Sequence, residues 1–408
     1  MDAVLERSAG LDVHQETVVA CVLIGELDKK PRKEIRTFET TTPELLSMAD
    51  WLVEKKCSHV AMESTGVYWK PIWNILEGCS FELILANAQR IKNVPGRKTD
   101  VKDAEWLAKL LRCGLIESSF VPPVEIRDLR DLTRYRKKLV NEATQEKNRI
   151  HKILQDANVK ITTYLSDVFG VSGRNILQAI ISGKPIPNDE LKVIVKGKAR
   201  DKIPQLVNAL NSRLRPHHRD MIRYSWEHLI FLEKKIGDIE TQINHCLTPY
   251  REEIELLDSI PAVDETAAAV IVAEIGTDMS VFPTDNRLCS WAGVTPGNNE
   301  SGGKKKRSKS TPGNKHLKAL LCECAWAATM TKNTRFHACY WRWVKRMGKQ
   351  KALVALAHLI LRIAYHVLKT KTPYHELGPD YLPDRTKRQE QRLIKSLEAK
   401  GYKVEKVA

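Results

Sequence analysis

The chain has 408 residues, more than the roughly 250–300 at which a single core usually divides, so we expect at least two domains. Hydrophobic residues make up 42 % and charged residues 28 %, a balance that excludes a wholly disordered chain. Lys and Arg number 66 against 50 Asp and Glu, and the net charge of +16 favours a polyanionic partner, above all nucleic acid.

The sequence also bears on location. No apolar run approaches the roughly 18–20 residues of a membrane-spanning helix, and residues 1–10 lack the cationic start and apolar stretch of a signal peptide. Nine cysteines without a framework spacing indicate reduced thiols, and the close pair Cys322 and Cys324 is expected to be buried rather than to bind zinc. We therefore expect a cytoplasmic protein.

The N-terminal region opens with consecutive strands. Residues 10–24 predict a hairpin that turns at Gln15 and Glu16, and a third strand is expected near residues 35–40. Helices and strands then alternate, with a helix for which Thr42 is the expected N-cap and later elements at 59–62, 69–76, 81–86 and 101–111. Because no crossover helix separates the opening strands, residues 1–122 are expected to form an α/β RNase-H-like (RuvC-like) domain rather than a doubly wound sheet.

The middle of the chain predicts two long helices. Residues 126–158 contain no Gly or Pro and are amphipathic, and residues 222–246 repeat apolar positions at steps of three and four, which is typical of a coiled coil. These helices pair either with each other or with a second subunit, and the sequence leaves both open. We expect residues 123–250 to form coiled-coil helices with an insert at about 160–215 to which no chemistry is assigned.

The last part of the chain is expected to be mainly helical. Residues 251–378 predict a C-terminal domain with an alanine-rich helix to Ile275 and further apolar helical patterns after residue 316. Residues 379–408 are basic and poor in apolar residues, so this tail is expected to be partly disordered.

Four carboxylates occupy positions that suit a metal site. Asp12 lies within the first strand, Glu63 ends the strand at 59–63, and Asp100 and Asp103 open a helix on one side of it. Burying a carboxylate in an apolar strand is unfavourable unless a partner such as a divalent cation compensates its charge. The four side chains therefore predict a site for Mg²⁺, with two ions roughly 3.5–4 Å apart that hold the attacking and leaving oxygens of a phosphodiester.

Each of these acids also has a simpler interpretation. Asp100 and Asp103 suit the first turn of a helix, where they favour the helix dipole. Asp12 can be a surface acid beside a turn, and Glu63 an ordinary loop residue. The loop at 87–98 adds cations that would draw a phosphate backbone towards the metals, or would merely be solvated: Arg90, Lys92, Arg97 and Lys98.

A second candidate site lies at residues 297–309. Ser301 stands beside Gly302 and Gly303, which let a backbone approach phosphate closely, so Ser301 is a candidate nucleophile. No local histidine supplies a base, so its activation would have to come from the carboxylate–metal site. On spacing alone, a flexible loop that binds nucleic acid without reacting is favoured. The loop's candidate nucleic-acid contacts are Lys304, Lys305, Lys306, Arg307 and Lys309.

Five motifs in this order resemble a known family, and the resemblance covers most of the chain. They span residues 10–14 (GLDVH), 62–66 (MESTG), 87–90 (NAQR), 98–104 (KTDVKDA) and 291–302, which contains WAGVTP and NNESG. The chain resembles the DEDD transposases of the "one-ten" and "eleven-eleven" groups of insertion sequences, described as bridge-RNA-guided recombinases.

The resemblance implies a RuvC-like first domain in which Asp12, Glu63, Asp100 and Asp103 bind magnesium. It also implies that Ser301 attacks DNA and forms a transient phosphoserine link, which reverses the conclusion from spacing. The site would be composite, with the carboxylates of one subunit meeting the serine of another in a dimer or tetramer. A structured noncoding RNA would guide it by pairing with donor and target DNA.

One departure from the family and two other functions remain. Members often have Pro-Gly-x-Gly where this chain has Pro261-Ala-Val-Asp264, which weakens a phosphate-gripping role for that turn. A metal-dependent Holliday-junction endonuclease would use water in place of the serine. A non-catalytic nucleic-acid-binding protein would explain the charge and the coiled coil alone.

Overall fold

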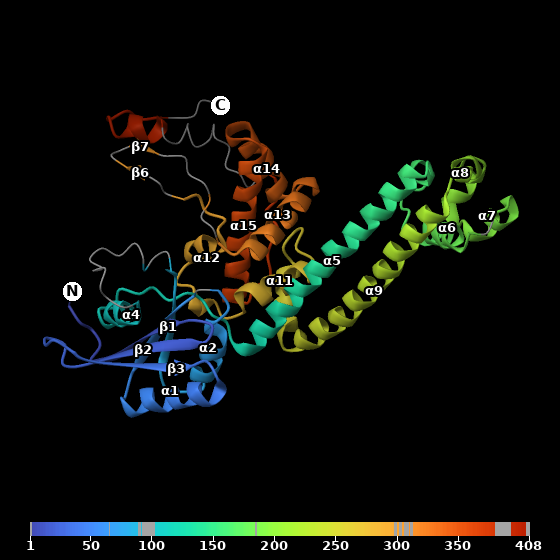
Figure 1. The fold of residues 1–408 in the computed structure, drawn as a ribbon. Coiled ribbons are helices and arrows are strands. Elements are labelled where there is room, and N and C mark those ends of the chain that lie inside the picture. Colours follow the sequence, from blue (N-terminus) through green and yellow to red (C-terminus); the bar gives the residue numbers. More distant parts are fainter. Residues whose placement is uncertain are drawn as a thin grey trace. The chain divides into compact units, whose positions relative to one another are not determined.

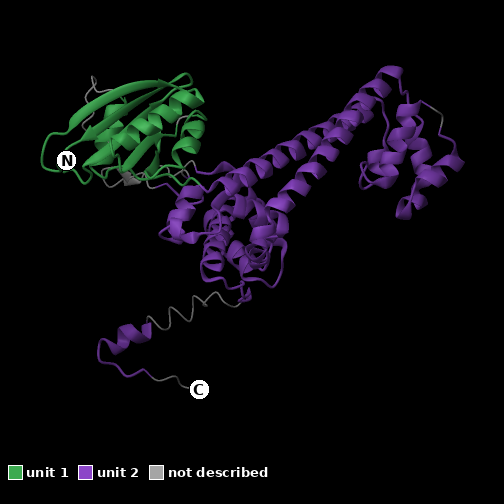
Figure 2. Cartoon of the chain, turned by 90° about the horizontal axis from the view of Figure 1, so that it is seen from below, with its two compact units in different colours: residues 1–121 green, residues 122–408 purple. Residues whose placement is uncertain are grey.

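The computed structural model describes residues 2–64, 66–88, 91, 103–183, 186–297, 300–301, 304–305, 310, 313–379 and 393–404. Contacts divide the chain into two compact units, residues 1–121 and 122–408 (Figure 2). A five-stranded sheet with helices forms the first unit, and the described part of the second is helical apart from a short hairpin (Figure 1). The finer four-part division expected from the sequence stays a prediction.

The sheet of the first unit is mixed, with strand order β3-β2-β1-β4-β5. Its strands are β1 (Arg7–Val13), β2 (Thr17–Ile24), β3 (Arg32–Glu39), β4 (His59–Glu63) and β5 (Glu82–Ala86). The first three are antiparallel neighbours, whereas β4 runs parallel to both β1 and β5. The predicted order of three consecutive strands followed by alternation is confirmed.

Helices cover both faces of this sheet: α1 (Thr42–Glu54), α2 (Trp69–Leu76) and α4 (Asp103–Arg112). The N-cap of α1 is Thr41 rather than the expected Thr42. Because side chains alternate along a strand, Ala9 and Leu11 pack into the cluster with α1 and α2, and the intervening positions of β1 face α4.

Gly10 fixes how closely α4 approaches β1. A Cβ atom at Gly10 would lie 2.4 Å from both the Ala104 carbonyl oxygen and the Ala108 amide nitrogen. The helix backbone therefore rests directly on the strand, and only glycine fits at this point. This contact carries the start of α4 towards the carboxyl end of β1.

In the second unit, α5 (Val124–Asp156) and α9 (Pro216–Cys246) pair lengthwise and antiparallel (Figure 1). Ion pairs join Arg136 to Glu240 at 2.6 Å and Lys147 to Glu233 at 3.7 Å. The predicted apolar seam of α9 is largely buried in this pair. The two helices thus pair within one chain, which the sequence had left open.

The insert is folded at the far end of this helical pair (Figure 1). It consists of α6 (Val171–Ser182), α7 (Asn188–Ile194) and α8 (Ile203–Leu210). Arg215 and His218 form a capping box at the start of α9, where the Arg215 amide donates to His218 Nδ1 at 3.3 Å. The 3₁₀ turns of this unit are Ile161–Thr163, Gly197–Lys202, Thr248–Tyr250 and Met279–Val281.

The remaining helices pack around α15 (Lys349–Thr370), a core helix, either directly or, for α11, through α10 and α13. They are α10 (Arg251–Asp258), α11 (Glu265–Ile275), α12 (Asp285–Ala292), α13 (Lys315–Met330) and α14 (Arg335–Met347). The prediction that no apolar run approaches membrane-spanning length does not hold for α15, because a window of 18 of its 22 residues has a mean hydropathy of 1.5, enough by length and composition to cross a membrane. Half of that apolar window is buried inside the unit.

Candidate active site

Three of the four predicted carboxylates lie at one end of the sheet. Leu11 in β1 is level with Met62 in the parallel strand β4, so Asp12 and Glu63 follow side by side. Both point to the face that α4 covers, and α4 begins at Asp103 in the described part of the chain. Asp100 lies outside the described residues.

The electrostatics of Asp12 reflect this arrangement. Its side chain is 28 % exposed and lies 3.3 Å from His14, measured between Asp12 Oδ2 and His14 Nε2. Burial raises the pKa of the Asp12 carboxyl; His14 opposes the shift, and the charges of Asp103 and Glu63 add to it. Such repulsion requires that Asp103 and Glu63 each lie within electrostatic reach of Asp12.

The carboxylates match a hard divalent cation by their donor chemistry. Oxygen ligands are those that Mg²⁺ prefers, and a cation would neutralise the repulsion that raises the pKa of Asp12. Across the described ranges, however, no group of three His, Cys, Asp or Glu side chains is placed to hold a metal ion. Asp12, Glu63 and Asp103 therefore form an acidic cluster, to which Asp100 would be the fourth member.

Most of the predicted cationic contacts lie outside the described residues: Arg90, Lys92, Arg97, Lys98, Lys306, Arg307 and Lys309. Lys304 and Lys305 form β7 (Lys304–Lys305), which pairs with β6 (Glu300–Ser301) in an antiparallel hairpin. Within it, Ser301 lies opposite Lys304. The serine is thus carried by a short paired segment with lysines on the returning strand.

The base of this hairpin is held by close contacts. An isolated bridge joins Pro296 to Ser310, and Lys318 Nζ donates to Ser310 Oγ at 2.6 Å. A Cβ atom at Gly313 would lie 2.2 Å from the Gly293 amide nitrogen, so the two ends of the loop meet backbone to backbone. The loop that carries Ser301 therefore begins after α12 and ends before α13 at the same place, where Gly293 and Gly313 are in contact.

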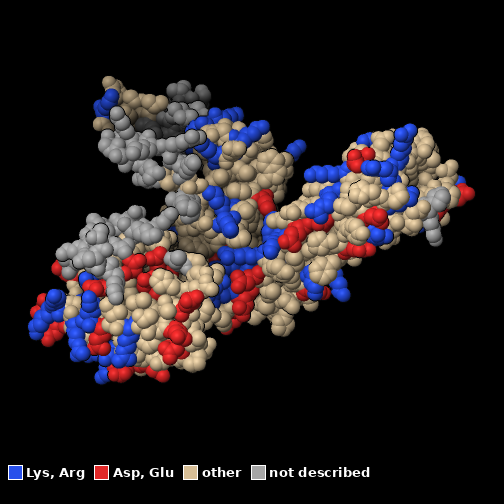
Figure 3. All heavy atoms as spheres, in the orientation of Figure 1, with Lys and Arg blue, Asp and Glu red and all other residues tan. Residues whose placement is uncertain are grey.

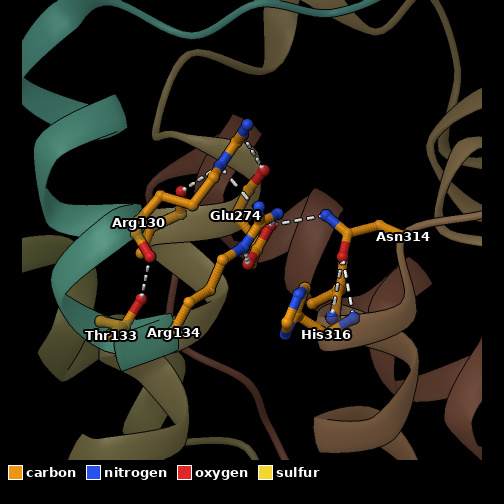
Figure 4. A network of polar contacts seen from close by, with 8 residues as sticks. Arg130, Thr133, Arg134, Glu274, Asn314 and His316 are labelled. Atoms are coloured by element: carbon orange, nitrogen blue, oxygen red, sulfur yellow. Dashed lines mark hydrogen bonds and ion pairs between the residues drawn. The ribbon is translucent and has the colours of Figure 1, made fainter. Parts of the chain in front are cut away.

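A buried carboxylate at this point connects three helices (Figure 4). Glu274, near the end of α11, is 0 % exposed and accepts hydrogen bonds from Arg134 Nε at 2.7 Å and Arg134 Nη2 at 2.8 Å. Its Oε2 also accepts from Asn314 Nδ2 at 2.5 Å. Arg130 Nη2 donates to the Glu274 carbonyl oxygen at 2.7 Å. Asn314 in turn caps α13 by accepting from the His316 and Leu317 amides.

Two arginines, Arg130 and Arg134, pair with the single carboxylate of Glu274 in this network. Burial alone would raise the pKa of the Glu274 carboxyl, but the hydrogen bonds from Arg134 and Asn314 outweigh it and the pKa is lowered. Burial lowers the pKa of Arg130 to about 10, which leaves it charged at neutral pH. The sequence did not predict this network, although Glu274 is the one charged residue in the apolar run 267–275 and could have indicated a buried ion pair.

The turn that departs from the family pattern begins the same helix. Ala262 has φ of +66°, a conformation that glycine adopts without strain. Asp264 is the N-cap of α11, and its side chain accepts from the Ala267 amide at 2.8 Å. The acid at this position therefore has a structural role in starting the helix that carries Glu274.

All nine cysteines are free, as expected from their spacing. Burial raises the pKa of Cys289 and of Cys324 to about 12, so these thiols stay protonated at neutral pH.

Comparison with known proteins finds two family matches. A model for the DEDD domain of IS110 elements, described as "Transposase", matches residues 9–159, and one described as "Transposase IS116/IS110/IS902 family" matches residues 254–341. The chain is also 25 % identical over 334 residues to the insertion element IS900 uncharacterized 42 kDa protein of Mycobacterium paratuberculosis, which covers 72 % of this chain and 80 % of the relative. It is 26 % identical over 285 residues to the protein y4qE of Sinorhizobium fredii, which covers 69 % of this chain and 58 % of that protein. The two matched ranges contain the acidic cluster and Ser301.

Proposed function

Because the chain belongs to the IS110 family of transposases, which are enzymes that cleave and rejoin DNA, we propose that it does so with a carboxylate–metal site and a serine nucleophile. The observation that carries the proposal is the acidic cluster of Asp12, Glu63 and Asp103, whose mutual repulsion contributes to the raised pKa of Asp12. The strand order supports an RNase-H-like first domain.

Asp12, Glu63 and Asp103 would hold Mg²⁺ together with Asp100. When bound, two such ions would supply Lewis-acid stabilisation for the charge that develops on a phosphodiester under attack. The protein's own contribution is to hold the carboxylates on elements that the Gly10 contact keeps together. His14, 3.3 Å from Asp12, orients that carboxylate within the cluster.

The serine step is a transesterification. Ser301 Oγ would attack the phosphorus, a Ser–O–P bond would form, and one P–O bond of the DNA would break to release a DNA hydroxyl that takes up a proton. Attack by a hydroxyl of another strand would reverse the step, so that the phosphodiester reforms and the serine regains its proton. No high-energy cofactor is required, since one ester replaces another.

DNA is the partner that a transposase requires. We further propose that a dimer or tetramer brings the acidic cluster of one subunit to Ser301 of another, and that a structured noncoding RNA directs the enzyme to its DNA sites. Both proposals rest on the family resemblance of the motifs around Asp12 and Ser301.

The decisive experiment combines the full chain with its noncoding RNA, Mg²⁺ and supercoiled DNA that carries the element ends. Ser301→Ala is expected to abolish both the covalent protein–DNA adduct on denaturing gels and strand exchange, by on the order of 10³-fold or more. Asp12→Ala should do the same. The matched controls are Ser290→Ala, an exposed serine of α12, and Asp28→Ala, an exposed acid of the first unit, and both should retain activity.

Full recombination by Ser301→Ala would show that the serine mechanism is wrong. Cleavage that needs Asp12 but leaves no covalent adduct would instead support the junction endonuclease that uses water. Loss of neither activity with Asp12→Ala would remove the carboxylate–metal site from the reaction.

A further inference from the structure

A cationic surface that includes none of the proposed catalytic groups lies on the helices α14 and α15 of the second unit. No Asp or Glu occurs between Glu323 and Glu376, whereas ten Lys and Arg do. Figure 3 shows Lys and Arg side chains gathered over α14. Most of this surface follows residue 341, where the second family match ends. We call it the α14–α15 face, and it consists of Trp341, Arg342, Lys345, Arg346, Lys349 and Lys351.

Four of these six side chains share one side of α14, and the other two follow in the first turn of α15. Trp341 is followed one turn later by Lys345, and Arg342 by Arg346, so the four lie together on α14 opposite its buried residues. Gly348, with φ of +81°, is the single residue between α14 and α15. Lys349 and Lys351 therefore follow the α14 cations closely along the chain, on different sides of the first turn of α15.

Trp341 is exposed but held in place. Its side chain is 47 % exposed, and its ring lies 5.2 Å from that of buried Tyr340 and 6.2 Å from that of His337, both edge to face. His337 is fixed in turn by its Nδ1, 2.7 Å from the Thr329 carbonyl oxygen. The indole is thus a rigid aromatic surface that is open on its outer side.

The cations beside Trp341 are exposed, and none forms an ion pair with a carboxylate of the described residues. Lys345 and Arg346 in the last turn of α14 favour the helix dipole, which is an ordinary structural role. Lys349 and Lys351 do not, because they stand in the first turn of α15, where positive charge is unfavourable. Their presence suits an external polyanion better than it suits the fold.

We propose that the α14–α15 face binds an unpaired DNA strand, with a base stacked on Trp341 and the phosphates held by the surrounding Lys and Arg. A duplex keeps its base faces stacked inside, so an open aromatic ring among cations is suited to a single strand. This inference rests on the proposed function, since strand exchange exposes unpaired DNA.

The test measures binding of a fluorescein-labelled 20-nucleotide oligothymidylate to the full chain by anisotropy over a series of salt concentrations. Trp341→Ala is expected to weaken binding roughly tenfold without changing the salt dependence, because stacking is lost and no charge is. Trp341→Phe should restore most of the affinity. Lys345→Gln with Arg346→Gln should lower the slope of log K against log salt by about 1.4, at roughly 0.7 for each phosphate contact of a single strand.

The matched control is Lys192→Gln with Lys235→Gln, which removes the same charge from lysines paired with Asp189 and Asp238. This variant should bind like the wild type. Thermal unfolding would verify that each variant is folded, which is expected because the altered side chains are exposed.

Unchanged affinity of Trp341→Ala would overturn the proposal. The proposal would also be overturned if Trp341→Ala lost more affinity for a 20-base-pair duplex, or for oligouridylate, than for oligothymidylate. The surface would then bind duplex DNA or RNA. Ser301→Ala should bind the oligonucleotide normally while it loses the covalent adduct, so failure of the serine mechanism and failure of this surface would be distinguished.

Discussion

The two halves of the proposed chemistry are positioned by different physical means. The acidic cluster depends on shape, because α4 rests on β1 with no room for a single added carbon at Gly10. The serine hairpin depends on charge in addition to the close backbone contact of Gly313 with Gly293, because Glu274, Arg134 and Asn314 hold its base in a buried network. The first half should therefore be sensitive to added volume, and the second to the loss of a charged partner.

The largest effect is expected where charge holds the structure. Glu274→Ala leaves Arg130 and Arg134 without their buried partner and should destabilise the second unit by about 3–5 kcal/mol in urea unfolding. Glu323→Ala is the control, since it breaks an exposed ion pair from α13 to the same helix α5 and should change stability by less than about 1 kcal/mol. Equal losses would contradict the charge-based half of the comparison. Because the pKa of Glu274 is lowered, its stabilisation is present above the pKa of an unfolded glutamate and is lost as pH falls through the folded value.

The contact of α4 with β1, which depends on shape, should be disturbed by the addition of one methyl group at Gly10. Gly10→Ala should destabilise the first unit by about 1–3 kcal/mol, because the new Cβ cannot avoid the Ala104 and Ala108 backbone. Gly237→Ala in α9, where a Cβ meets nothing within 4 Å, should instead stabilise the chain by up to about 1 kcal/mol. Calorimetry of both variants would measure the contrast, and a neutral Gly10→Ala would mean that α4 can move away from β1.

A smaller effect should come from relieving repulsion in the acidic cluster. Asp12→Asn is expected to raise stability at pH 7.5 by about 1 kcal/mol in EDTA. The pKa of Asp12 is raised, so its contribution to stability is fully present below the pKa of an unfolded aspartate and is lost as pH rises through the folded value. The advantage of the variant should therefore vanish in acid.

In Mg²⁺ the wild type, rather than Asp12→Asn, should be the more stable protein. The wild type should gain about 2.7 kcal/mol when free Mg²⁺ is a hundred times its Kd, and Asp12→Asn should gain much less. An equal gain in both proteins would show that Asp12 is not a ligand.

The smallest effect concerns the turn before α11. Ala262→Gly should stabilise the second unit by about 0.5–1 kcal/mol, because glycine accepts the φ of +66° without strain. Ala262→Val should have the opposite sign, since a β-branched side chain is disfavoured there. If both variants unfold at the urea concentration of the wild type, this turn does not limit the stability of the helix that carries Glu274.

Local patterns in the sequence were sufficient for much of the fold. The predicted helix at 69–76 matches α2, and the strand that ends at Glu63 matches β4, because apolar periodicity and strand length are local properties. The order of the strands and of α4 then places Asp12, Glu63 and Asp103 at one end of the sheet. The Glu274 network could not be predicted in the same way, since Arg134 lies 140 residues away in sequence. Nor could the sequence decide that α5 pairs with α9 of its own chain.

Because α5 and α9 are antiparallel, the chain runs out to the insert along α5 and returns along α9, so the start of α5 and the end of α9 lie at the same end of the pair. The length of this helical pair is then independent of the rest of the unit. Removing seven residues from each helix at matching positions would draw the insert inward by about 10 Å and keep the apolar seam in register. The paired helices α5 and α9 could thus be shortened or lengthened together without disturbance to either end of the pair.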